Sequence, residues 1–396
     1  MSARRTIGIL AVTQIVSWGA LYYAFAVLAP AIQRDLGIGA ETAFAAFSWS
    51  LLVAGISATP IGALVDRHGG RHVMAAGSLV CAAGLVWLSR CSTTLSYFGA
   101  WTVIGLAMAL TLYEAAFATI NRKVGHGAAR AISTLTLFAG FSSTIFWPLT
   151  LAIASRLGWR DTYLVYALLQ LALCLPLHLW LGRDAPHPPA APDAPRDSHT
   201  LAEAVRHPIF WKLALAFSAN VFIFSALAVH LIPLLQSLGH TAATAVMLAA
   251  LVGPMQVAGR IGERTLARDT APQVVGRFVF ATLPFGLLVL TLLGTRAWAV
   301  ALFCLLYGMS NGVLTIIRGT LPRALFGARH YGAIMGALAA PSLLSKAAAP
   351  LLAAAILSGA SGATMLPWWL CGCALASLLL YLSATRTSRT PAAKAA

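Results

Sequence analysis

Long apolar runs recur along the whole chain, and they constrain its fold more than any other feature. Each run holds about 20 residues, enough for an α-helix to cross the roughly 30 Å hydrocarbon core of a bilayer. Only 10% of the residues are charged, whereas ordinary soluble domains carry about 25%. The sequence therefore predicts an all-α membrane protein with twelve transmembrane helices, over residues 7–31, 42–65, 73–90, 96–120, 131–155, 162–182, 208–236, 242–262, 274–294, 297–319, 332–357 and 364–384.

The basic residues are distributed unevenly between the two ends of these spans. With the N-terminus placed inside, 21 of the 27 Lys and Arg residues fall at inner ends, five fall outside, and Lys346 lies within a span. Inner loops of membrane proteins carry this excess of basic residues. The formal charge of +16 thus indicates topology, and a nucleic-acid partner is not needed to explain it. We expect a multi-pass protein of the cytoplasmic (inner) membrane with both termini cytoplasmic.

The first run also bears on processing. After MSARR the apolar residues continue well beyond the length of a signal-peptide core, so we expect a retained span rather than a cleaved leader.

One polar segment divides the spans into two sets of six. The stretch GRDAPHPPAAPDAPRDSHT, residues 182–200, is rich in proline, alanine and charge, and such composition is typical of a connector that packs no core. We therefore predict an N-terminal half (1–182), a cytoplasmic linker (183–207) and a C-terminal half (208–396). Two halves with equal span counts are typical of transporters built from repeated units.

The chain offers no pattern for catalysis or for a cofactor. Its six cysteines lie mostly in apolar segments and are interpreted as small packing residues. We find no phosphate-binding loop, no zinc-ligand spacing and no nucleophile elbow. The sequence predicts a protein that is not an enzyme, holds no metal and no cofactor, and takes its energy from ion or solute gradients.

A motif between the second and third spans points to a family. The segment GALVDRHGGRHV, Gly62 to Val73, resembles the loop signature of the major facilitator superfamily, with an extra Gly70 and with His72 where a basic residue is usual. The matching positions, which we call the inner-loop latch, are Gly62, Asp66, Arg67, Gly69 and Arg71.

Physical chemistry gives these latch positions a function. Gly62 permits close helix approach, Asp66 can accept hydrogen bonds from Arg67 or from a neighbouring helix end, and the glycines permit a tight turn. Such a contact can hold one conformation and break in another; the plain alternative is an ordinary basic inner loop. GRIGERTLAR, Gly259 to Arg268, resembles a degraded copy of the motif. The resemblance implies two pseudo-symmetric six-helix halves and alternating access.

Two further stretches resemble the monocarboxylate carriers and the oxalate–formate antiporters of that superfamily. One runs from span 5 into span 6, with Pro148 in mid-span and Gly158-Trp159-Arg160 after it. The other is span 1, SWGALYYAFAVLAPAIQ, with its Trp-Gly pair and paired tyrosines. The resemblance implies a small organic anion, a monocarboxylate, as the substrate, moved by proton symport or by antiport.

Lys346 is a candidate residue for binding the carboxylate of that substrate. It follows the expected start of span 11 by about 14 residues, roughly 21 Å along a helix axis, and a charge so deep usually faces a cavity or a partner. In the oxalate–formate antiporters a lysine of span 11 and a basic residue of span 8 hold the carboxylate, which makes Arg260 the second candidate here. The alternatives are a structural ion pair for Lys346 and a place near the inner loop for Arg260.

Other polar residues within the spans complete the candidate site. Glu114 can carry a proton, pair with Lys346, or form a structural salt bridge, and His230 can titrate or simply hydrogen-bond between helices. Substrate contacts are predicted for Trp18, Tyr22, Tyr23, Asn220 and Asn311, and hydrogen bonding between helices is the alternative for the asparagines and tyrosines.

Two other functions remain open on the sequence alone. A carrier of a bulkier or neutral solute such as a vitamin, or a drug exporter, would use aromatic stacking by Trp18, Tyr22, Tyr23, Phe222 and Phe224. A membrane sensor without transport is the third class.

Overall fold

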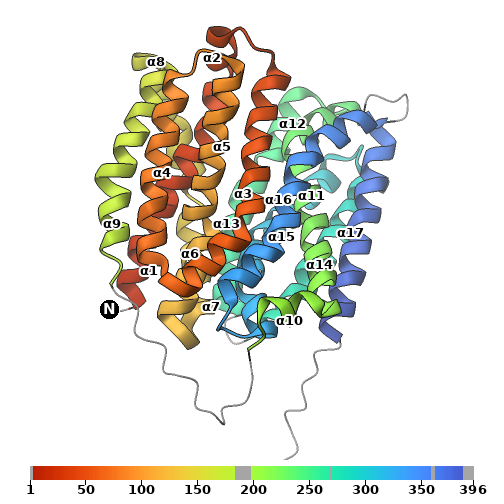
Figure 1. The fold of residues 1–396 in the computed structure, drawn as a ribbon. Helices are drawn as coiled ribbons and strands as arrows, with labels where there is room; N and C mark the ends of the chain where they lie inside the picture. Colours follow the sequence, from red (N-terminus) through yellow and green to blue (C-terminus); the bar gives the residue numbers. More distant parts are fainter. Residues whose placement is uncertain (1–2, 183–197, 268–269, 358–361, 387–396) are drawn as a thin grey trace, which may run out of the picture. The chain divides into compact units, whose positions relative to one another are not determined.

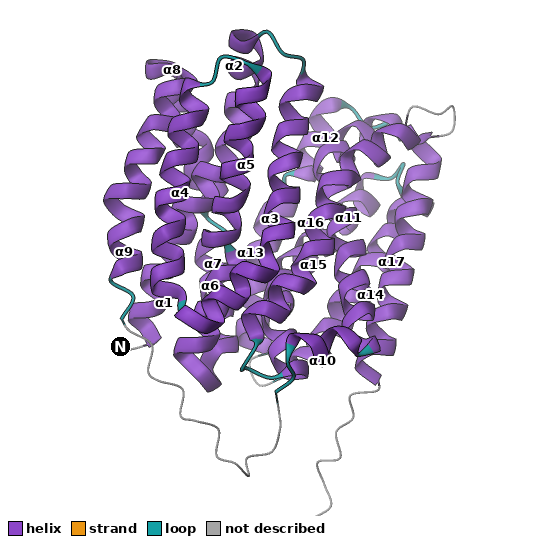
Figure 2. Ribbon diagram, viewed as in Figure 1, coloured by secondary structure: helices purple, strands orange, loops and turns teal. Residues whose placement is uncertain are grey.

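The computed structural model describes residues 3–182, 198–267, 270–357 and 362–386. Within these ranges every regular element is a helix (Figure 2). The chain divides into two compact units, Met1–Thr200 with Phe326–Leu344, and Leu201–Leu325 with Ser345–Ala396. The segment 326–344 thus belongs to the first unit although it follows most of the second in sequence. The predicted boundaries at 182 and 208 stay predictions.

The first unit is built from nine α-helices, three short π- or 3₁₀-turns and the beginning of one further helix (Figure 1). They are α1 Ala3–Trp18, η1 Gly19–Tyr23, α2 Ala24–Leu36, α3 Ala40–His68, α4 Gly70–Arg90, α5 Thr94–Thr111, α6 Tyr113–Val124, η2 Gly125–Gly127, α7 Ala128–Ala139, α8 Ser142–Leu169, η3 Gln170–Cys174, α9 Leu175–Leu179 and the first part of α16 Tyr331–Leu357. Helix α5 packs against α3 and α4, and α8 packs against α4 and α2. The core includes Phe25 stacked on Phe47 at 4.7 Å between ring centroids, with Trp101 edge-on to both.

The second unit contains the remaining helices. They are α10 Leu201–Arg206, α11 Pro208–Ser237, α12 Ala242–Ala249, α13 Val252–Leu266, α14 Pro272–Leu293, α15 Ala297–Phe326, the second part of α16 and α17 Gly362–Arg386. Helix α17 packs against α11 and α14, and Tyr381 stacks on Phe280 at 4.2 Å. Most of the predicted linker, 183–197, lies outside the described residues, whereas its last part forms α10 because Ala204 is buried.

The predicted number of spans is confirmed. The described residues contain eleven helical stretches long and apolar enough to cross a membrane, and ten of them match one predicted span each. The other, Ala128–Leu179, has 52 residues, although a span needs only about 20. Gly158 divides it, because its backbone is non-helical at φ 79° and ψ 172°. This stretch therefore holds spans 5 and 6.

The helix that contains span 10 extends past the predicted span. Span 10 is predicted over 297–319, and α15 continues to Phe326 with Pro322 inside the helix. A proline costs a helix one backbone hydrogen bond and bends it without always ending it. The helix ends instead before Gly327, whose φ of 84° is the left-handed conformation typical of a C-terminal glycine cap.

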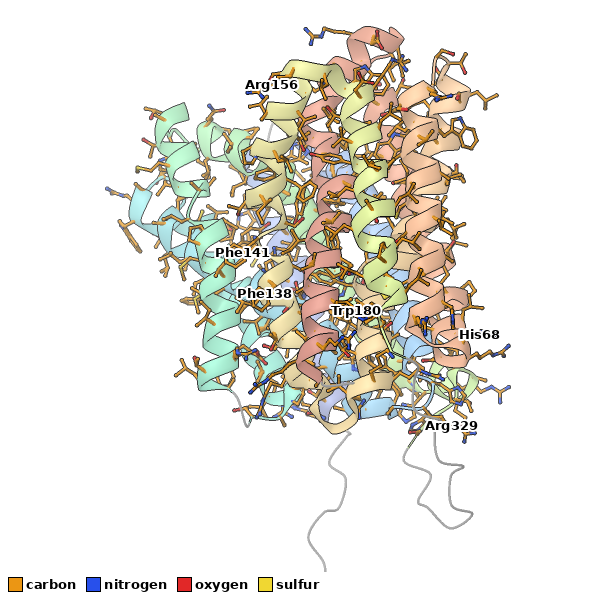
Figure 3. The ribbon with its side chains drawn as sticks, turned by 90° about the vertical axis from the view of Figure 1, so that its left-hand side faces the viewer. His68, Phe138, Phe141, Arg156, Trp180 and Arg329 are labelled. Carbon is orange, nitrogen blue, oxygen red and sulfur yellow. The ribbon has the colours of Figure 1, made fainter. Side chains whose placement is uncertain are left out.

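The surface of the first unit has charged ends and an apolar middle. Figure 3 shows Arg156 toward one end and His68 and Arg329 toward the other, with Phe138 and Phe141 between them. Phe138 is 47% exposed and Phe141 is 42% exposed. Apolar side chains exposed between two charged ends match the two interfaces and the hydrocarbon core of a bilayer.

Candidate functional site

The fourth span is broken beside the predicted acidic residue Glu114. Leu112 has an extended backbone, φ −82° and ψ −160°, so α5 ends at Thr111 and α6 begins at Tyr113. Because Leu112 is not helical, the Thr111 carbonyl cannot reach the amide four residues on. The buried side chain of Gln14 on α1 donates to that carbonyl at 2.5 Å. Glu114 lies in the first turn of α6 and is partly exposed, and the partial positive charge of a helix N-terminus stabilises a carboxylate there.

The first span carries a second irregularity, and it holds the predicted aromatic residues. One π-helical turn, η1, separates α1 from α2, and a side chain at its first residue, Gly19, would collide with the ring of Phe146. Turns of this kind often occur at functional sites. Trp18 lies at the end of α1, and Tyr22 and Tyr23 lie within the turn.

These three residues join an aromatic cluster contributed by α1, η1, α3, α6 and α8 of the first unit. The Trp18 ring lies 5.4 Å from Tyr22 and 5.0 Å from Tyr113 between centroids. Tyr22 lies 5.2 Å from Phe47 of α3, and Tyr23 lies 5.8 Å from Trp147 of α8. We call this set the aromatic cluster; its members are Trp18, Tyr22, Tyr23, Phe47, Tyr113 and Trp147.

Lys346 lies in the middle of α16, where a proline shapes its surroundings. Pro350 has no N–H, so the Lys346 carbonyl four residues earlier lacks its helical donor. The Ser225 hydroxyl of α11 donates to that carbonyl at 2.7 Å. One turn further along both helices, His230 Nε2 lies 3.0 Å from the Pro350 carbonyl and must donate, because a carbonyl only accepts. The predicted proton carrier His230 thus has its Nε2 engaged in a contact between helices. The Lys346 side chain is partly exposed.

Arg260 lies at a close contact of α13 with α15. It is 7% exposed, and its Nε lies 3.4 Å from the Gly312 carbonyl. A side chain at Gly259 would meet the Met309 backbone, and one at Gly312 would meet the Gln256 backbone. The backbones of α13 and α15 are therefore in contact at these glycines, because small residues let two helices approach closely.

The two predicted asparagines differ in their surroundings. Asn220 is 1% exposed, and its amide donates to Ser377 of α17 and to the Ala216 carbonyl. Asn220 thus forms a hydrogen bond between helices, which the sequence analysis gives as the alternative to a substrate contact. Asn311 is partly exposed on α15.

The inner-loop latch residues meet the start of α16. A side chain at Gly62 would collide with the Gly332 carbonyl, and one at Gly336 would collide with the Ala58 carbonyl. The Asp66 carboxylate accepts from the Gly332 and Ala333 amides, both at 2.9 Å. These amides belong to the first turn of α16, where backbone donors lack helical partners and favour an anion.

The rest of that loop supports this contact. Gly69 has φ 80°, a conformation that favours glycine, and Arg67 is exposed. A side chain at Gly70 would collide with Thr119, which explains the extra glycine of the motif. Arg71 is partly exposed. From α6, Arg122 donates to the Asp66 backbone carbonyl.

Gly158-Trp159-Arg160 forms a separate contact at the ends of other helices. The Arg160 guanidinium pairs with Asp35 at 2.9 Å and donates to the Ser89 and Cys91 carbonyls, each at 2.8 Å. The Trp159 indole also donates to Asp35 at 3.1 Å. This triplet therefore joins α8 to the ends of α2 and α4.

The structure thus brings some predicted residues together and adds others. In the first unit Trp18, Tyr22 and Tyr23 share a cluster that Phe47, Tyr113 and Trp147 complete. In the second unit Lys346 and His230 lie one turn apart along the α11–α16 contact. No sequence pattern singles out Tyr113, although it directly precedes Glu114 and so lies in the same first turn of α6.

Comparisons with known proteins agree with this architecture. The family model described as Major Facilitator Superfamily matches residues 10–350. Monocarboxylate transporter 3 of Rattus norvegicus is 28% identical over 323 residues, covering 77% of this chain and 64% of that transporter. Monocarboxylate transporter 4 of Mus musculus is 25% identical over 323 residues, covering 77% and 67%. The chain spans less than two thirds of the length of the first of these relatives.

Two solved structures resemble the fold over nearly the whole chain. The human organic anion transporter MFSD10 (TETRAN) superposes with a TM-score of 0.72 at 16% identity, covering 96% of this chain and 100% of the other. The E. coli fucose:proton symporter FucP superposes with a TM-score of 0.75 at 15% identity, covering 98% and 100%. At such identity these two show the fold alone. The family match over most of the sequence settles the assignment: the chain belongs to the Major Facilitator Superfamily.

Proposed function

We propose that this transporter moves a small organic anion, a monocarboxylate, across the cytoplasmic membrane by alternating access. The single observation that carries the proposal is the position of Lys346. It follows the first residue of α16, Tyr331, by 15 residues and precedes the last, Leu357, by 11. At 1.5 Å per residue these distances are about 22 Å and 16 Å, so the side chain cannot extend to either end of the helix.

A cation kept at this depth needs an anion for part of the transport cycle. Charged side chains within spans usually face a bundle interior or a cavity and mark the path of a ligand. A carboxylate that binds Lys346 neutralises it, which lowers the free-energy cost of closing an apolar wall around the pair. The similarity to proteins named monocarboxylate transporters supports this choice of substrate.

Other residues take auxiliary functions in the proposal. The proposed substrate contacts are Arg260, Asn220, Asn311, Trp18, Tyr22 and Tyr23. Glu114 or Nδ1 of His230 would carry a proton in symport, and exchange of one anion for another is the other coupling mode. The inner-loop latch residues would hold one conformation through Asp66 and the amides of α16.

The membrane location is part of the same proposal. The excess of Lys and Arg at one end of the spans supports an inner-membrane protein with both termini in the cytoplasm.

Lys346→Ala tests the function. Purified protein in liposomes is given labelled acetate, lactate, pyruvate or benzoate, with and without an inward proton gradient. We expect the variant to lose at least tenfold of the uptake of whichever anion the parent carries, because the substrate loses its counter-charge. Lys346→Arg should retain part of that uptake.

A matched control tests whether the loss of uptake depends on the position of the lysine that is removed. Lys212→Ala removes a lysine five residues into α11, near the helix start, and should leave uptake within twofold. Near-normal uptake of every anion by Lys346→Ala, with an unchanged melting temperature, would contradict the proposal.

A further inference from the structure

The second half of α15 exposes a stripe of polar side chains. Over residues 310–322 the partly exposed side chains are Asn311, Thr315 and Arg318, and all the others are buried. The three are spaced by four and three positions, which places them within about 60° of one another around a helix. This part of α15 therefore presents an amide, a hydroxyl and a guanidinium along one line. We call these three residues the polar stripe.

The contacts of α15 show which neighbours border the polar stripe. Tyr307 donates to the Phe224 carbonyl of α11 at 3.1 Å, and a side chain at Gly312 would meet the Gln256 backbone of α13. On a helical wheel with 3.6 residues per turn, the polar stripe lies between Tyr307 and Gly312. The polar stripe is therefore bordered by α11 and α13, two helices of the same unit.

Other helices of the second unit show what a lipid-exposed face contains. Helix α14 exposes Phe278 at 71%, Phe285 at 56% and Leu292 at 60%, and α17 exposes Leu379 at 66%. These side chains are apolar, as the hydrocarbon core of a bilayer favours. A guanidinium within a span is costly against acyl chains, and charged side chains there face a bundle interior or a water-filled cavity. The chemistry of the polar stripe therefore indicates that it borders water.

Arg318 lies nearer to an end of its helix than Lys346 does. It precedes the last residue of α15, Phe326, by eight residues, about 12 Å along the axis. Lys346 follows the first residue of α16, Tyr331, by 15 residues, about 22 Å. In the proposed topology both of these helix ends are cytoplasmic. Counted along each helix, Arg318 is thus the cation closer to the cytoplasm.

From this placement we infer that the polar stripe is a second anion site, which holds the transported carboxylate between Lys346 and the cytoplasm. The inference rests on the proposed function for the identity of the anion and for the topology. The planar fork of donors on Arg318 matches a carboxylate, and the Asn311 amide adds a neutral donor on the same line. Thr315, whose hydroxyl donates to the Asn311 backbone carbonyl at 3.2 Å, lies between them.

A permanent ion pair is the rival function for Arg318. Glu263 of α13 is a partly exposed acid on the helix that packs against α15 at Gly312. An arginine kept by an acid in every state would be closed to the substrate. The experiment must therefore detect the anion at the polar stripe itself.

Cysteine labelling tests whether the polar stripe borders water. The background is Cys373→Ala, because Cys373 is partly exposed and the other five cysteines are buried. In lipid nanodiscs, where both faces of the protein are accessible, Thr315→Cys should react with the anionic thiol reagent MTSES, because the reactive thiolate forms in water. Phe285→Cys, on the exposed apolar face of α14, is the matched control and should react at least tenfold more slowly. Equal rates at the two positions would overturn the inference.

Protection by the anion tests binding. The carboxylate that the parent transports, at a concentration that saturates uptake, should slow the reaction of Thr315→Cys at least threefold relative to chloride at the same ionic strength. Adding Arg318→Gln should abolish this protection, and adding Arg318→Lys should retain part of it. Adding Lys346→Ala should leave at least half of it, because the two sites are separate.

The outcomes separate the second site from the proposed function. Protection that survives Arg318→Gln would assign this arginine to a structural pair and overturn the inference, with the Lys346 proposal left intact. Protection abolished by Lys346→Ala and by Arg318→Gln alike would indicate one shared site and would also overturn it. A reactive cysteine that no carboxylate protects, in a parent that transports one, overturns the second site alone. A parent that transports no carboxylate removes the proposed function and the inference with it.

Discussion

In the first unit Gly62 lies against the backbone of α16, and in the second unit Gly259 lies against the backbone of α15. Both glycines are followed four residues later by an acid and then by an arginine. In the first unit that acid, Asp66, accepts two hydrogen bonds from the start of α16. In the second unit the residue next to the glycine, Arg260, is buried beside the Gly312 carbonyl.

The difference separates a contact that can open from one that stays closed. Asp66 and the amides of α16 lie at helix ends, where water can replace either partner. Gly259 and Gly312 lie within α13 and α15, and neither glycine has a side-chain acceptor that water could replace. The α3–α16 contact therefore suits a conformational latch, and the α13–α15 contact suits permanent packing.

The largest effect should come from filling the two glycine positions. A valine at Gly62 collides with the Gly332 carbonyl, and one at Gly259 collides with the Met309 backbone. We expect Gly62→Val to reduce uptake at least tenfold with a small fall in melting temperature, because the proposed latch requires α3 and α16 to close against each other. Gly259→Val should lower the melting temperature more, since overpacking costs about 1–3 kcal/mol or more.

Gly372→Ala is the control for both variants, because a side chain there meets nothing within 4 Å. Equal losses of stability in the two valine variants would remove the distinction between the contacts.

Removing the Asp66 carboxylate should have a middle-sized effect. Asp66→Ala deprives the Gly332 and Ala333 amides of their acceptor, and loss of such a cap costs about 1–2 kcal/mol. Hydrogen exchange at the start of α16, measured by mass spectrometry, should accelerate about five- to thirtyfold. Glu263→Gln, at the matching position of the second unit, should leave exchange in α16 unchanged; acceleration there by both variants would show that the acids act alike.

The smallest effect is expected at Arg260. Arg260→Lys keeps the charge and removes the Nε–H beside Gly312, a long bond at 3.4 Å. We expect a fall in melting temperature of about 1–2 °C, since a single hydrogen bond contributes about 1 kcal/mol net. A loss of transport much larger than the loss of stability would support the proposed contact of Arg260 with the substrate.

The sequence was sufficient for the architecture because hydropathy and the Gly62–Val73 motif depend on local residues. Apolar runs predict spans directly. In the motif, Gly62 predicts a close approach of two helices, and Asp66 predicts a polar contact beside it. The breaks within the helical spans could not be predicted from local sequence. The stretch TLYEAA around Leu112 contains neither proline nor glycine, and its break is stabilised by Gln14, about a hundred positions earlier in the chain.

Side-chain surroundings were also beyond local patterns. Asn220 and Asn311 look alike in sequence, yet one is buried against Ser377 and the other is partly exposed. In the loop after α15, the Ala328 carbonyl accepts from Asn121 at 2.9 Å, a contact between residues far apart in the sequence. Such outcomes depend on which helices become neighbours.

The Gln14 side chain has a mechanical consequence. Thr111 ends α5 with its carbonyl directed at an amide from another span, at 2.5 Å, and separating the pair within hydrocarbon would strand both groups at a cost of about 1–3 kcal/mol each. This hydrogen bond therefore opposes separation of spans 1 and 4. We expect any rearrangement that accompanies transport to move these two spans together as one rigid body.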